Sequence, residues 1–150
     1  MNWKVTVVGG LAFFVATFVI GMATGPVIHS GILQAAYKAN STFWQPALAA
    51  DPPDMAAIMP YWIVSGIVFG LVIAGIYGCT RGSFSGPAWK KGLSYGLTMA
   101  VFYCAVLGQL SGLFYLPAKI WIWWGVEALI VWALGGAVMG VAVAKVAPES

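Results

Sequence analysis

The sequence has 150 residues, of which 61% are hydrophobic and 7% are charged, with a mean hydropathy of +0.91. Since about 25% of the residues of a soluble domain are charged, this composition excludes an ordinary soluble domain and indicates an integral membrane protein. The formal net charge is +3, but the basic residues are spread over the ends of apolar segments instead of forming one patch. We therefore expect a lipid bilayer as the surroundings and no nucleic-acid partner.

Four apolar segments are each long enough to cross a bilayer, because about 20 helical residues span its ~30 Å hydrocarbon core. The predicted spans are residues 4–28, 54–78, 87–110 and 117–145, and residues 29–53 form a long connection between the first two. This pattern predicts one all-α transmembrane domain over residues 1–150, folded as a four-helix bundle.

The first span could be mistaken for a signal peptide, since the small residues Ala47-Leu48-Ala49 look like a cleavage site. A signal peptidase site normally follows an apolar run of about 7 to 15 residues directly, whereas this one lies far beyond the run. We therefore expect the first span to be a retained helix. Gly25-Pro26 should bend or loosen it near its end.

Acidic residues and prolines stand where the later helices begin. Asp54 precedes the second span, where negative charge meets the positive end of the helix dipole, and Pro87 and Pro117 start the third and fourth helices. Pro60 lies inside the second span, so that helix either kinks or begins there.

Basic residues near the helix ends predict the orientation, because positively charged flanks are retained in the cytoplasm. Lys38 and Lys119 flank one side of the four spans. The other side carries Lys4, Arg81, Lys90, Lys91 and Lys145. This bias predicts that both termini are cytoplasmic and that residues 29–53 are external.

The chain also carries an internal repeat. Trp3-Lys4 followed by Gly10-Leu11 matches Trp89-Lys90 followed by Gly96-Leu97 at the same spacing. Since each half then starts on the cytoplasmic side, we expect two helical hairpins that are parallel repeats, related by an axis along the membrane normal.

Pairs of glycines four residues apart occur in every predicted span. In lipid, close backbone approach over small residues supplies packing energy between helices, so these glycines predict a tight bundle or, alternatively, a dimerisation face. The residues are Gly21, Gly25, Gly66, Gly70, Gly92, Gly96, Gly108, Gly112, Gly136 and Gly140.

Glu127 is the strongest candidate for a functional site. Inserting a carboxylate into the bilayer near mid-span costs roughly 2.5 to 3.5 kcal/mol unless it is paired or protonated. At 100° per residue, Gly136 lies on the opposite face of the same helix. The glycine face should therefore meet one neighbouring helix, while Glu127 points toward a cavity, a second neighbour or another subunit. The alternative is a structural glutamate that is protonated or hydrogen-bonded.

His29 is the candidate partner of Glu127. Both residues lie near the outer boundary of the predicted ~30 Å core, and their side chains lean toward the same depth, since each leans toward the N-terminus of its own helix. Such a pair could bind a proton or a cation. The alternative is that His29 is a hydrogen-bonded cap at the interface.

The sequence supports a cofactor site or an enzyme activity less well than a site at Glu127 and His29. A copper site would add Met22, Met55, Met59, Asp51 or Asp54 to His29, and a haem would need a His/Met pair, but no diagnostic spacing is present. No nucleophile with a base, phosphate loop or Cys-x-x-Cys occurs either. We predict no metal and no cofactor, and we do not expect an enzyme that acts alone.

Several short motifs occur in one order along most of the chain. They are Val27-Ile28-His29-Ser30-Gly31-Ile32-Leu33, Tyr37, Phe43-Trp44-Gln45-Pro46, Lys91-Gly92-Leu93-Ser94-Tyr95-Gly96-Leu97, and Trp124 with Glu127 and Gly136. This pattern resembles that of small four-span bacterial membrane proteins of uncharacterised function, which have Ile-His-Gly, Trp-Arg-Pro and Lys-Gly-x-x-Tyr-Gly-Leu. The resemblance implies that His29, Trp44 and Glu127 belong to one outer-face feature. Gln45 replaces the usual arginine, which weighs against an anion site there.

Three functional hypotheses follow. The first, and the leading one, is a non-enzymatic accessory or scaffold subunit of the bacterial inner membrane that binds other membrane proteins or itself, since the external connection with Tyr37, Trp44, Asp51 and Asp54 offers most of the non-lipid surface. The second is a small transporter, or a proton- or cation-handling protein, that uses Glu127 and His29. The third is an outer-face haem or copper site.

Overall fold

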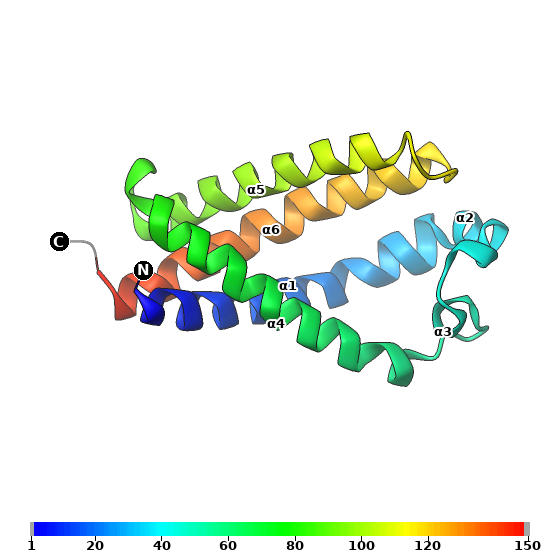
Figure 1. Ribbon diagram of the computed structural model, residues 1–150, viewed down its shortest axis with the longest axis horizontal. Coiled ribbons are helices and arrows are strands. Elements are labelled where there is room, and N and C mark those ends of the chain that lie inside the picture. The colour runs from blue at the N-terminus through cyan, green and yellow to red at the C-terminus, as the bar shows by residue number, and fades with distance from the viewer. Residues whose placement is uncertain (1, 149–150) are drawn as a thin grey trace.

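Four long helices make up most of the protein in the computed structural model, which describes residues 2–148 (Figure 1). They are α1 (Trp3–Val27), α4 (Met55–Thr80), α5 (Ala88–Leu110) and α6 (Ala118–Val146). Each is long and apolar enough to cross a membrane, and their bounds lie within a few residues of the predicted spans. The predicted all-α four-helix bundle is confirmed, and it is consistent with a multi-pass membrane protein.

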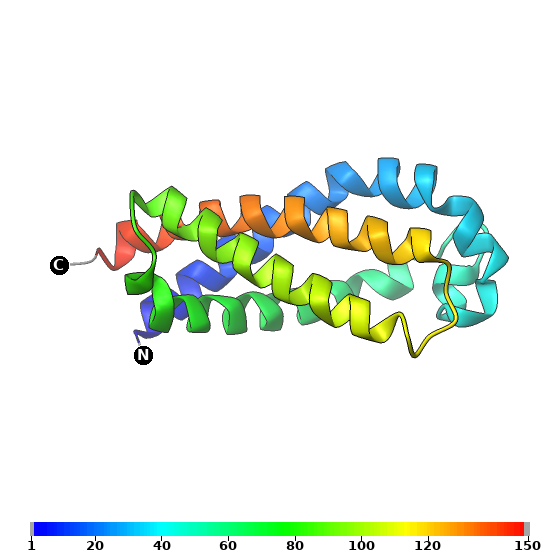
Figure 2. The same cartoon turned by 90° about the horizontal axis from the view of Figure 1, so that it is seen from above.

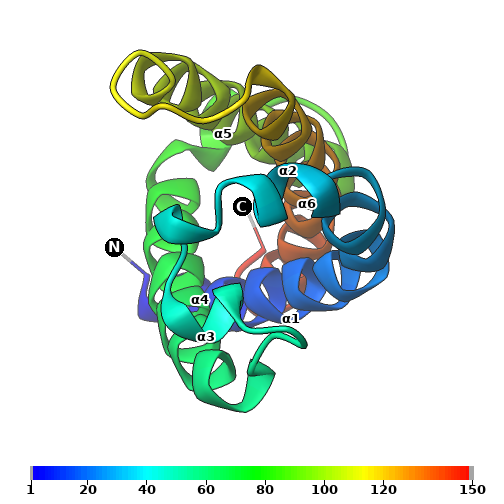
Figure 3. The ribbon, with the colours of Figure 1, turned by 90° about the vertical axis from the view of Figure 1, so that its right-hand side faces the viewer.

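The first connection, predicted as a loop, is largely helical. It contains the π-helix η1 (Ile28–Ile32), α2 (Gln34–Ala39), the 3₁₀ helix η2 (Ser41–Phe43) and α3 (Pro46–Ala49). Figure 3 shows these elements covering one end of the bundle, with α2 beside the ends of α1 and α6. Helices this short are marginal in isolation, so their packing on the bundle, which the local sequence does not reveal, stabilises them. A further 3₁₀ turn, η3 (Arg81–Ser83), follows α4.

The helices contact one another in the order α4, α1, α6, α5. Helix α1 contacts α4 and α6, and α6 contacts α1 and α5, so α1 and α6 are the two inner members of the row. Figure 2 shows α1 and α6 crossing near their middles. The ends of the bundle differ in charge, since the helix ends that lie with the chain termini (Figure 1) carry most of the basic residues.

Glycine lets the backbones of α5 and α6 approach closely. An added Cβ at Gly92 would overlap the carbonyl oxygen of Gly136, and one at Gly136 would overlap that of Gly92. Gly96 and Gly140 meet backbone atoms in the same way. In the other hairpin, Gly70 lies against the backbone of Gly10, while Gly66 lies against a phenylalanine ring of α1.

The other four predicted packing glycines do not lie between helices. Nothing lies within 4 Å of an added Cβ at Gly21 or Gly108, and at Gly25 and Gly112 the nearest atom belongs to a residue within four positions along the chain. Packing within the bundle is thus not found for these four, because spacing alone does not say which face a neighbouring helix covers. Gly21 lines a cleft, and Gly108 lies on an exposed face.

Most of the buried apolar side chains form two separate cores. The core near the termini takes residues from all four long helices: Val5, Phe13, Ile73, Ala74, Tyr77, Tyr95, Met139, Val143 and Ala147 at the end of α6. The outer core consists of Ile28, Leu33 and Ile120, with partly buried aromatic residues around them. Since α4 and α5 contribute nothing to the outer core, apolar burial does not hold them together at that end.

Helices α4 and α5 consequently diverge. They are linked near the termini, where the hydroxyl of Tyr95 in α5 donates to the carbonyl oxygen of Ile73 in α4 at 2.7 Å and the rings of Tyr95 and Tyr77 lie 5.2 Å apart. Figure 1 shows the two helices separating toward the end that carries α2 and α3. The bundle is therefore closed at one end and open between α4 and α5 at the other.

Tyr95→Phe should lower the free energy of unfolding by about 0.5–1.5 kcal/mol, because it removes one buried hydrogen bond and little else. The measurement is thermal or denaturant unfolding in a mild detergent. Tyr115→Phe is the matched control, since Tyr115 is fully exposed. Equal stabilities of the two variants would contradict the inter-helix role of the Tyr95 hydroxyl.

Candidate functional site

A π-helical turn places His29. Pro26 lies in the last turn of α1 and has no N–H to donate to the carbonyl four residues earlier. The chain then widens into η1, where the N–H of Leu33 donates to the carbonyl oxygen of Ile28 at 2.8 Å. Single π turns are frequent at functional sites. The predicted loosening after Gly25-Pro26 is found there, and His29 lies within it.

His29 and Glu127 lie together. The Nε2 atom of His29 is 2.9 Å from Oε2 of Glu127, and the hydroxyl of Thr24 donates to Oε1 of the same carboxylate at 2.7 Å. On the other side of the imidazole, Nδ1 lies 2.7 Å from the hydroxyl of Tyr37. Trp124 donates its indole N–H to that hydroxyl oxygen at 2.8 Å. We call these five residues the His29–Glu127 site.

The hydrogen bonds assign the tautomer of His29. Because the indole N–H of Trp124 donates to the Tyr37 oxygen, the Tyr37 hydroxyl proton needs another acceptor, and Nδ1 of His29 is in place to receive it. The imidazole then carries its proton on Nε2 and donates it to Glu127. In this arrangement every donor has an acceptor, and the successive bonds all point toward the carboxylate.

Tyr37 contacts the imidazole as a neutral phenol. Burial raises the pKa of its phenol, and the negative charge of Glu127 raises it further, although the hydrogen bond from Trp124 acts in the opposite direction. The hydroxyl therefore keeps its proton at neutral pH. A partner that fixes the tautomer in this way is the usual arrangement for a working histidine.

The site opens onto a cleft of about 760 Å³. The side chain of Glu127 is 17% exposed and that of His29 is 39% exposed, so the carboxylate lies deeper than the imidazole. The cleft is within the size range of small-molecule sites. Residues from all four long helices and η1 line it: Gly21, His29, Trp62, Ser65, Gly66, Phe69, Tyr103, Trp124, Glu127, Ala128, Val131 and Trp132.

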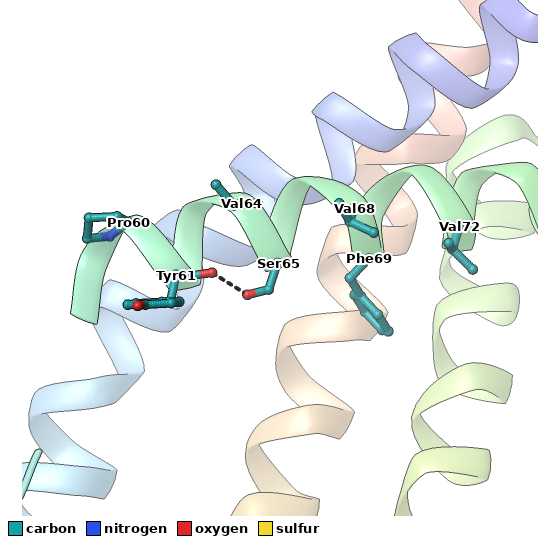
Figure 4. A pocket seen from close by; sticks show the side chains of 7 residues that line it. All are labelled: Pro60, Tyr61, Val64, Ser65, Val68, Phe69 and Val72. Atoms are coloured by element: carbon teal, nitrogen blue, oxygen red, sulfur yellow. Dashed lines mark hydrogen bonds between the residues drawn. The ribbon is translucent and has the colours of Figure 1, made fainter. Parts of the chain in front are cut away.

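A second, apolar groove of about 650 Å³ runs along α4. Figure 4 shows its lining side chains following one stretch of this helix, from Pro60 to Val72, with the Ser65 hydroxyl bonded to the carbonyl of Tyr61 at 2.6 Å. Ser65 and Phe69 line both the groove and the cleft. The two spaces therefore adjoin on the side where α4 and α5 diverge.

Two of the four predicted contact residues of the external connection reach the site region. Tyr37 belongs to the site, and the indole N–H of Trp44 donates to the backbone oxygen of Tyr37 at 3.1 Å. Asp51 instead pairs with Lys38 at 3.2 Å, with both side chains largely exposed, and such pairs contribute little to stability. Asp54 caps α4 by accepting from the N–H of Ala57 at 3.1 Å.

Metal ligands do not gather at this site. Within residues 2–148, no three His, Cys, Asp or Glu side chains lie close enough together to hold a metal ion. Both ring nitrogens of His29 already face hydrogen-bond partners. The copper and haem hypotheses therefore gain no support from the geometry.

The contacts of Thr24 with Glu127 and of Trp124 with Tyr37 were not predicted from the sequence. A signal exists for Trp124, since it precedes Glu127 by three residues and so shares its helix face. Thr24 offers only its polarity within an apolar run. Its contact with Glu127 depends on how α1 and α6 cross, which periodicity does not specify.

Tyr37→Phe should leave the indole N–H of Trp124 and Nδ1 of His29 without their partner, at a cost of about 1–3 kcal/mol in unfolding free energy. In a ¹⁵N-labelled sample, the indole N–H resonance of Trp124 should shift. That of Trp89, which is exposed at the start of α5, should not. An unchanged Trp124 resonance would contradict the hydrogen bond.

Comparisons of the chain with protein-family models, with curated proteins and with solved structures found no match. Function therefore has to be argued from the chemistry of the site itself. That chemistry consists of a half-buried carboxylate, an oriented imidazole and an open cleft beside them.

Proposed function

We propose that this protein is a small transporter, or a proton- or cation-handling membrane protein, whose working groups are Glu127 and His29. The observation that carries the proposal is the 2.9 Å contact of the two side chains at the edge of a cleft. With His29 neutral and Glu127 ionised, the pair holds one negative charge. Uptake of one proton or one monovalent cation neutralises it, so the two ions compete for the same place.

The free-energy cost of a charged Glu127 within a membrane span supports a functional role for this residue. A carboxylate within a membrane span is expensive, and such residues commonly mark ion or substrate pathways. A purely structural glutamate would be expected to lie closed off from solvent. Glu127 instead lines a cleft on a side of the bundle where two helices separate.

The proposal includes a location and an orientation. The resemblance to four-span bacterial proteins favours the bacterial inner membrane. The concentration of lysine and arginine at the bundle end that holds the termini favours a cytoplasmic location for that end. The His29–Glu127 site would then face the outer side. The parallel repeat is part of the same proposal, supported by glycine contacts in both hairpins.

A second candidate function is the accessory or scaffold subunit. The observation that favours it is the turn between α5 and α6, where Leu113 is 74% exposed and Tyr115 is fully exposed. Phe114 beside them contacts the ring of Phe43 at 5.8 Å. An exposed apolar tip of this kind suits a partner subunit or a second copy of this chain.

Two measurements separate these candidates. The purified protein is reconstituted into liposomes with an internal pH dye, and proton flux is recorded after an imposed pH or cation gradient. The protein is also extracted at native abundance in mild detergent, and everything that migrates with it is identified. Flux above that of protein-free liposomes supports the transporter function. A stoichiometric partner without flux would replace it with the subunit function.

A further inference from the structure

We propose that the cleft binds an organic ammonium ion with an apolar body, its cationic head at Glu127 and its body in the groove along α4. This inference rests on the proposed role of Glu127 in cation handling and names the class of ligand. Three properties of the cleft support it: its hydrogen-bonding capacity, its charge and its shape.

The His29–Glu127 site has unused hydrogen-bond acceptors, and they lie on the Glu127 carboxylate. A carboxylate offers about four lone-pair positions, and Thr24 and His29 occupy one on each oxygen of Glu127. The hydroxyl proton of Tyr37 and the Nε2 proton of His29 are both already donated within the site. The remaining capacity at the carboxylate is therefore for accepting hydrogen bonds, and a matching ligand must be a donor.

The charge of the cleft favours a cation. Of the residues that line it, Glu127 is acidic and none is lysine or arginine. Its walls also include five large aromatic side chains, from Trp62, Phe69, Tyr103, Trp124 and Trp132. Aromatic rings attract ammonium groups, and more strongly where water is excluded. These walls suit a cation better than an anion.

The shape of the cleft favours an apolar body attached to that head. Ser65 and Phe69 are shared by the cleft and by the groove on α4, whose other lining residues are nearly all apolar (Figure 4). The groove lies where α4 and α5 diverge, so a molecule dissolved in the bilayer can reach Glu127 laterally, between these two helices. The ammonium group could belong to a free lipophilic amine or to a phosphatidylethanolamine headgroup.

The test is equilibrium binding by calorimetry in maltoside micelles at fixed pH. The probes are 4-butylbenzylammonium and its neutral analogue 4-butylbenzyl alcohol, which share an apolar body. The ammonium probe should bind about tenfold or more tightly than the alcohol, as expected for a partly desolvated ion pair. Glu127→Gln should abolish this difference. Asp51→Asn, which makes the same change at an exposed position, should preserve it.

A second variant guards against a folding defect in Glu127→Gln. Gly21 lines the cleft and has open space around it, so Gly21→Leu should fill the cleft without a clash. Both probes should then bind about tenfold more weakly or not at all. Equal affinity for the two probes in the wild-type protein, a preference for the ammonium probe that survives Glu127→Gln, or undiminished binding to Gly21→Leu would each overturn the proposal.

Added lipids identify the source of the ammonium group. If phosphatidylethanolamine displaces the ammonium probe and phosphatidylglycerol does not, the occupant is a lipid headgroup. If neither lipid displaces it, the occupant is a free amine. Binding and flux are measured separately, so the two proposals can fail separately. Weak ammonium binding together with Glu127-dependent proton flux would exclude the organic ammonium ligand but leave the proposed transport function in place. Strong binding without flux removes the transport function instead.

Discussion

Glu127→Gln should reduce proton flux in proteoliposomes to the rate of protein-free liposomes. Glutamine keeps the size of the side chain and can still accept the Nε2 proton of His29, while its amide can donate to the hydroxyl of Thr24. The fold should therefore survive, and the lost property is the charge. Loss of a charge interaction of at least ~2 kcal/mol in the partly buried site corresponds to a loss of rate of about thirtyfold or more, which brings the flux down to the background of protein-free liposomes.

The control for this result is Asp51→Asn, which removes a carboxylate outside the site and should leave the flux unchanged. Thermal unfolding of both variants in detergent shows whether the fold is intact. Wild-type flux in a folded Glu127→Gln protein would exclude Glu127 as the ion-binding group and would favour the accessory-subunit function. A His29→Leu variant should lower the flux as well, since Glu127 would lose the imidazole N–H that donates to its carboxylate.

Gly136→Leu should destabilise the bundle by roughly 3 kcal/mol, at the upper end of the range for overpacking. The reason is the contact between α5 and α6, where an added Cβ at Gly136 meets the carbonyl oxygen of Gly92 and the Cα atom of Gly96. Backbone atoms cannot move aside as a flexible side chain does, so the two helices must separate. Unfolding in mixed detergent, followed by circular dichroism, measures the loss.

Gly108→Leu is the matched control, because an added Cβ at Gly108 meets nothing within 4 Å. The substitution should be neutral or slightly stabilising, since glycine disfavours a helix by about 1 kcal/mol relative to good helix formers. Equal effects at the two positions would mean that α5 and α6 do not pack over glycine. The comparison also tests whether all the glycine pairs contribute to packing or only those between helices.

The two cores explain why the site can be open in a stable bundle. Near the termini, all four long helices bury side chains together, and Phe13, Tyr77 and Met139 are almost completely enclosed. At the outer end, the buried contacts join η1 to α6 and leave α4 and α5 apart. Stability is thus concentrated away from Glu127, as is usual where a binding region needs accessible space.

The sequence by itself determined the class of protein and the extent of its long helices. An apolar run of bilayer length has to form a helix, since every backbone polar group must find its hydrogen-bond partner within the segment. The same reasoning marked Glu127, because an ionisable residue in such a run stands out against the apolar background. The rise per residue and the tilt of side chains in a helix also predicted that His29 lies at a depth similar to that of Glu127.

Only the tertiary structure decided which of these residues meet. Helical periodicity fixes the faces of one helix but leaves its neighbours and crossing points open, so the contacts of Thr24 with Glu127 and of Trp124 with Tyr37 could not be predicted. The same uncertainty made Gly21 and Gly108 look equivalent to Gly92 and Gly136. The short helices of residues 28–49 were missed because their stability comes from docking on the bundle, and that docking brings Tyr37 to His29.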